Sequence, residues 1–102
     1  MEVKKMFQKQ LIISLIKDDL INSKLVHGLN EAGLNADIYF LHLGETIFTL
    51  MGFEDNETTD GIFEYYMQLL KKAKYLDIST SHKPLEDFAQ KIYVELEGLR
   101  GR

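Results

Sequence analysis

Two histidine–carboxylate pairs have the residue types and the spacing that most closely match a metal-binding site. His27 and Glu31 are four positions apart, and His42 and Glu45 are three positions apart. In an α-helix both spacings place the two side chains on one face. If the chain turns near Asn35, the two helices run antiparallel and His27 stands level with His42. Two imidazoles and two carboxylates would then converge, which is a ligand set suited to a divalent metal ion.

The metal site is one hypothesis, and the alternative is that these histidines face different ways and are solvated or satisfied by neighbouring groups. The order His-x-x-Glu is the reverse of the Glu-x-x-His of di-iron bundles, and the chain has too few inward carboxylates for that class. No cofactor is expected beyond a metal ion at these four residues.

Signals of enzymatic catalysis are missing from the sequence. The chain has no cysteine, which excludes thiol nucleophiles, disulfides and cysteine-ligated zinc. Its serines lack a glycine elbow, and there is no phosphate-binding glycine-rich loop. The loop at 54–61 has the composition of a calcium loop, but Met67 occupies the position that requires a bidentate glutamate. We therefore predict a protein without enzyme activity and without catalytic residues.

The acidic character of the chain argues against a nucleic-acid binder. The formal net charge is −4 and the isoelectric point is about 5.3, whereas a basic surplus is the usual footprint of nucleic-acid binding. A regulator associated with nucleic acid is kept as a weaker alternative, because four lysines gather around Tyr75: Lys71, Lys72, Lys74 and Lys83.

Membrane insertion is not expected. The apolar run at 11–16 is too short to span a bilayer, and charged residues follow it directly. The first residues lack the pattern of a signal peptide. The sequence therefore predicts a cytoplasmic protein that does not enter a membrane.

The aromatic side chains indicate a protein–protein interface. Two pairs of neighbouring aromatic residues occur within expected helices, and neighbours in a helix point to different faces, so they cannot all enter one core. Tyrosine is also favoured at interfaces. We predict a non-enzymatic interaction or dimerisation module, a homodimer or the binder of another protein, with an interface that includes Tyr39, Phe40, Tyr65 and Tyr66.

The elements that must position these residues are helices. Apolar residues recur mostly at spacings of three and four, which is the period of an α-helix packed on one side. The sequence predicts an all-α fold, a compact bundle or orthogonal array of four to five helices, that forms a single domain over residues 1–102. Short loops favour antiparallel neighbours.

The expected helices cover residues 3–32, 36–51, 62–76 and 84–99, and the first range is either one long helix or two. Gly33 and Gly52 each precede an apolar residue, which is the pattern of a left-handed helix end. Two apolar rows are expected to face the core from the first helix: Val3, Phe7, Leu11 and Leu15 beside Ile12, Ile16 and Leu20.

Overall fold

The fold is built from helices alone over the residues that the structure describes. The computed structural model describes residues 2–33 and 43–101, with side chains from Lys5 onward. Its elements are α1 (Glu2–Glu31), α2 (Gly44–Met51), α3 (Glu57–Lys71), the 3₁₀ turn η2 (Lys72–Tyr75) and α4 (Lys83–Arg100). The all-α prediction is confirmed. No helix in these ranges has the length and apolar character needed to cross a membrane.

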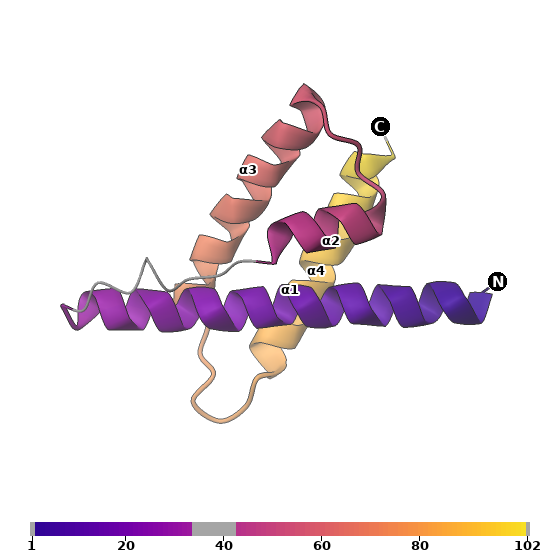
Figure 1. Cartoon of the computed structure of the whole chain (residues 1–102). Coiled ribbons are helices and arrows are strands. Elements are labelled where there is room, and N and C mark those ends of the chain that lie inside the picture. Colours follow the sequence, from indigo (N-terminus) through magenta and orange to yellow (C-terminus); the bar gives the residue numbers. More distant parts are fainter. Residues whose placement is uncertain (1, 34–42, 102) are drawn as a thin grey trace.

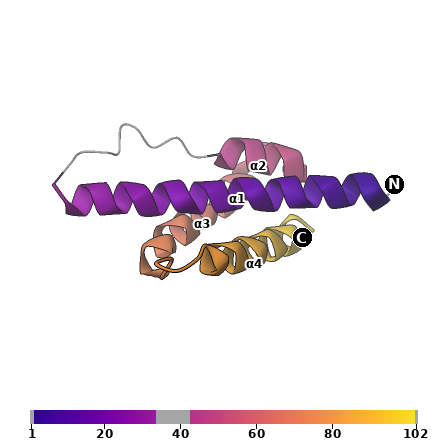
Figure 2. The ribbon, with the colours of Figure 1, turned by 90° about the horizontal axis from the view of Figure 1, so that it is seen from below.

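Helix α1 is the element on which the others assemble. It is one continuous helix of 30 residues, so the question of one helix or two is settled in favour of one. Figure 1 shows α3 and α4 crossing α1 steeply and running in opposite directions to each other. The short α2 lies along α1 and runs against it, and Figure 2 shows α2 on one side of α1 with α3 and α4 on the other.

The core forms where these helices meet α1. Ile12, Ile16 and Leu20 lie on the inner row of α1 and are buried in a core cluster that also contains side chains of α2, α3, η2 and α4. Full burial of such a side chain contributes about 1.5 to 3 kcal/mol. The predicted row that begins with Val3 and Phe7 is wrong over its described first half, because Phe7 is 72 % exposed and Leu11 is 50 % exposed. The helical period alone could not show that α1 continues past the elements that cover it.

Local helix ends agree with the sequence. Gly33 and Gly52 have φ angles of 86° and 87°, the left-handed conformation that glycine adopts without a steric penalty. After Gly52, the Phe53 N–H donates to the carbonyl of Phe48 at 3.0 Å, and the two rings stack with centroids 4.5 Å apart. The predicted end of the helix at Gly52 and its Phe53–Phe48 contact are confirmed.

The predicted helix over residues 36–51 is wrong as a continuous element. Leu43 is not helical and stands immediately before α2, which begins at Gly44. Residues 36–42 lie outside the described part of the chain. The helix therefore begins at a point that depends on tertiary structure, because the N–H of Leu43 donates to Asp19 Oδ1 of α1 at 2.7 Å.

The start of α3 allows a direct test of local capping. Asn56 is the N-cap, and its side chain accepts a hydrogen bond from the N–H of Thr59 at 2.9 Å. We expect Asn56→Ala to lower the free energy of unfolding by about 1 kcal/mol in urea denaturation. Asn56→Asp keeps an acceptor and is expected to stay close to wild type. Equal losses for the two variants would contradict the capping role.

Candidate functional site

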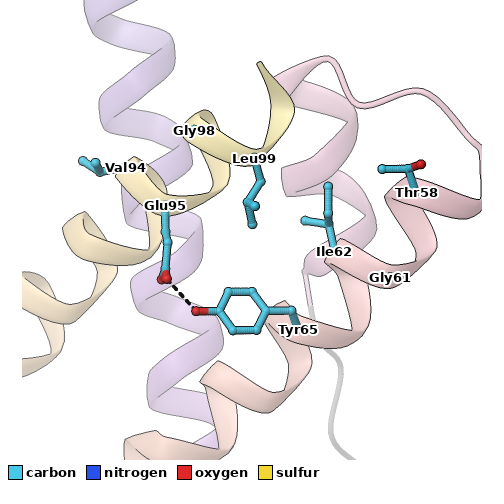
Figure 3. A pocket seen from close by; sticks show the side chains of 8 residues that line it. All are labelled: Thr58, Gly61, Ile62, Tyr65, Val94, Glu95, Gly98 and Leu99. Carbon is cyan, nitrogen blue, oxygen red and sulfur yellow. Dashed lines mark hydrogen bonds between the residues drawn. The ribbon is translucent and has the colours of Figure 1, made fainter. Parts of the chain in front are cut away.

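A surface groove lies between α3 and α4 (Figure 3). All its lining residues come from these two helices, and its volume is about 620 Å³. The groove is lined by Thr58, Gly61, Ile62 and Tyr65 of α3 and by Val94, Glu95, Gly98 and Leu99 of α4. Because the helices are antiparallel neighbours, two short stretches that are far apart in the sequence form its opposite walls.

The groove is apolar and has room between its walls. Ile62 and Leu99 are half-buried along it, and Val94 is 67 % exposed. A Cβ atom built on Gly61 or on Gly98 would meet no other described atom within 4 Å. Two helix-interior glycines therefore leave open space where ordinary side chains would fill the gap between α3 and α4.

One hydrogen bond crosses the groove. The hydroxyl of Tyr65 donates to Glu95 Oε1 at 2.5 Å, and Figure 3 shows the two side chains reaching toward each other from α3 and α4. This bond to a carboxylate, with smaller contributions from partial burial and the charge of Glu95, raises the pKa of Tyr65 above its ordinary value. Tyr65 is 36 % exposed, so the structure places it at the surface, as an interface residue would require.

The surroundings of the groove are predominantly acidic. Residues 25–70 contain no lysine and no arginine. Glu57 and Glu64 are exposed on α3, and Glu95 lies in the groove itself. Arg100 follows Leu99 directly on α4, and its guanidinium pairs with Glu97 at 2.9 Å. The groove therefore presents apolar surface with a surplus of negative charge.

The prediction that Tyr66 lies at an interface is wrong. Tyr66 is fully buried, and its hydroxyl donates to Asp19 Oδ2 at 2.6 Å. Asp19 is also fully buried, with its other oxygen accepting the N–H of Leu43. Negative charge is favourable at this point because it faces the N-terminus of α2. The pair Asp19–Tyr66 joins α1, α2 and α3 inside the core and offers no access to a substrate.

The four predicted metal ligands are not brought together as far as the structure describes them. Asp19 stands level with Leu43, and His27 lies eight residues further along α1, a rise of about 12 Å. Since α2 runs toward the N-terminus of α1, Glu45 lies even further than Leu43 from His27 and Glu31. No cluster of three metal-ligating side chains occurs among the described residues. His42 lies outside them, so the metal site stays a prediction.

The remaining predicted residues divide between exposed and undescribed positions. Tyr39 and Phe40 lie outside the described ranges, and their place at an interface stays a prediction. The lysines of the basic cluster are exposed at the end of α3, in η2 and at the start of α4. Lys83 pairs with Asp87 at 3.5 Å, and the ammonium of Lys74 lies 5.1 Å from the ring centroid of Tyr75. Such contacts are typical of a solvated surface.

Sequence reasoning missed the groove. Gly61 and Gly98 are visible in the sequence as glycines inside helical patterns, and each is a signal of close approach or open space. The sequence does not show that α3 pairs with α4, which is what places the two glycines on opposite walls of one groove. Comparison with known proteins gives no family for the chain, since no family model, no curated protein and no solved structure matches it.

Proposed function

We propose that the chain is a non-enzymatic protein-interaction module, which holds an amphipathic helix with basic side chains in the groove between α3 and α4. The observation that carries this proposal is the open apolar groove itself, with Gly61 and Gly98 on opposite walls. An amphipathic helix laid in a hydrophobic groove is a recurring mode of protein recognition. The homodimer and the cytoplasmic location expected from the sequence belong to the same proposal.

The shape of the site favours a helix over a small ligand. The groove lies open between two helices and does not enclose a cavity, and its polar groups are few. A row of apolar side chains at helical spacing can follow such a channel and cover Val94, Ile62 and Leu99. Burial of exposed apolar surface supplies the driving force for association.

The charge of the site favours a basic partner. Glu95 lies in the groove, and Glu57 and Glu64 lie on the same helix as its α3 wall. Lysine or arginine side chains beside the apolar face of the partner would meet these carboxylates. Complementary charge of this kind raises the rate of association and disfavours acidic partners.

Filling the groove from within is the sharpest test. Gly98→Leu places a side chain in open space and replaces glycine by a better helix former, so the variant is expected to fold. We expect a fluorescein-labelled amphipathic helical peptide of leucine and lysine to bind wild type in an anisotropy titration. Gly98→Leu should weaken that binding at least about tenfold, which corresponds to about 1.4 kcal/mol.

Two controls make the result specific. Gly28→Leu changes another helix-interior glycine with open space around it, away from the groove, and should bind the peptide as wild type does. A peptide in which glutamate replaces lysine should bind much more weakly to wild type. Equal affinity for wild type and Gly98→Leu, or for the two peptides, would reject the groove as a site for basic helices.

A further inference from the structure

The first turns of α1 are a second exposed surface of the molecule, although the Gln8 amide donates to the carbonyl of Leu50 at 2.6 Å and the ammonium of Lys9 lies 5.7 Å from the ring centroid of Tyr93. They extend beyond the other helices in both views (Figure 1, Figure 2). Every side chain of residues 5–11, which we term the N-terminal arm, is exposed. Three of them are large apolar residues: Met6 is 65 % exposed, Phe7 72 % and Leu11 50 %. Apolar side chains gathered in this way on one projecting helix mark a contact surface.

The arm carries positive charge, whereas the groove carries a negative charge. Residues 5–11 contain Lys5 and Lys9 and no acidic residue, so the arm is basic as well as apolar. The groove is apolar with Glu95 inside it, and its α3 wall lies in a stretch, residues 25–70, without lysine or arginine. The two exposed surfaces of one chain are therefore opposite in charge and alike in apolar character.

We propose that the N-terminal arm of a second copy of this chain occupies the groove between α3 and α4. This inference rests on the proposed function and names the helix that the groove holds. Phe7 and Leu11 would contact the apolar walls at Ile62 and Val94, and the lysines would approach Glu95. A helical arm of seven residues is about 10 Å long, which is two turns of helix laid between α3 and α4.

The arm of the same chain cannot make this contact. Helix α1 continues without a break from the arm into the core, where Ile12, Ile16 and Leu20 are buried. Bending the arm back toward the groove would break backbone hydrogen bonds of α1 and withdraw that row from the core. The occupant must therefore come from another molecule. Each chain has one arm and one groove, so a two-fold exchange uses both surfaces and closes the assembly.

Light scattering on the full chain at micromolar concentration tests the exchange. Wild type is expected at twice the 11.8 kDa of one chain. Two variants are each expected at the monomer mass: Phe7→Ser combined with Leu11→Ser removes the apolar face of the arm, and Gly98→Leu fills the groove. Leu25→Ser, at another exposed position of α1, and Gly28→Leu serve as matched controls and should stay dimeric.

Mixing the two variants separates arm–groove contact from every other dimer. The arm variant keeps an intact groove, and Gly98→Leu keeps an intact arm, so the mixture should form a heterodimer held by one contact although neither variant associates alone. A dimer made by arm against arm would survive Gly98→Leu, and a dimer made by groove against groove would survive the arm variant. Either result would overturn the inference, as would a mixture that stays monomeric.

Peptide binding to the groove is measured separately from dimer formation. If wild type is monomeric but still binds the leucine–lysine peptide in a way that Gly98→Leu weakens, the exchange is wrong and the proposed function stands. If wild type is dimeric and a labelled peptide of residues 2–14 competes with the dimer, both stand. A monomeric protein that binds neither peptide rejects both.

Discussion

Asp19→Ala is expected to lower the free energy of unfolding by about 3 to 5 kcal/mol, because it leaves one buried and one part-buried donor without an acceptor. The Tyr66 hydroxyl and the Leu43 N–H both donate to the carboxylate of Asp19, and Asp19 and Tyr66 are fully buried. A protein of this size is stable by about 5 to 15 kcal/mol in total. Calorimetry should therefore show a melting temperature lower by more than about 10 °C.

Two further variants separate the carboxylate from its surroundings. Asp19→Asn keeps the shape and one acceptor oxygen, so its loss should lie between wild type and Asp19→Ala. Asp18→Ala removes the exposed neighbouring carboxylate and should stay within about 0.5 kcal/mol of wild type. An Asp19→Ala protein as stable as Asp18→Ala would show that the Asp19–Tyr66 pair contributes nothing to stability.

The second large effect is a loss of stability in alkali that depends on Tyr66. Burial raises the pKa of Tyr66 far above the ordinary 10.0, and the charge of Asp19 and its hydrogen bond raise it further. Above pH 10 the unfolded chain loses this proton while the folded chain keeps it. The unfolded state then binds fewer protons, so stability falls as pH rises, by about 1.4 kcal/mol per pH unit from this group.

Urea denaturation of wild type and Tyr66→Phe across pH 9 to about 11.5 measures this effect. Tyr66→Phe is less stable near neutral pH, because Asp19 loses a donor, but its stability should fall less steeply above pH 10. Raised pKa values of Tyr65 and Tyr93 leave a residual slope of the same sign in both proteins. Identical slopes for the two proteins would show that Tyr66 is not held protonated by the fold.

Features governed by neighbours in the sequence could be predicted, and features governed by the packing of helices could not. The end of α2 at Gly52 follows from local backbone chemistry, whereas α3 begins at Glu57, five residues before the helix that the sequence predicted from residue 62. Asp19 shows the opposite case. Helix α1 continues through it without a break, and its carboxylate accepts the N–H of Leu43 at the start of α2, 24 residues later.

The candidate sites differ in the same way. The metal hypothesis depended on the register of two helices, and one contact between Asp19 and Leu43 fixes α2 too far along α1 for Glu45 to meet His27. The apolar row with Phe7 and Leu11 has the correct helical period, yet burial also requires a neighbour at that point of α1. The groove could be predicted only with the pairing of α3 and α4, which places Gly61 and Gly98 on its opposite walls.

The way every other helix rests on α1 sets the order in which the chain can fold during synthesis. The contacts of α1 join residues far apart in the chain: Ser23 bonds the carbonyl of Leu70, and Lys17 bonds Glu86, at separations of 47 and 69 residues. Closing such long loops before native contacts form slows folding relative to bundles of sequential hairpins. On the ribosome α1 emerges first, yet its inner row of Ile12, Ile16 and Leu20 is not fully covered until α4 has been made. A nascent chain of this protein therefore exposes an apolar helix for most of its translation, which is the condition under which chaperones engage nascent chains.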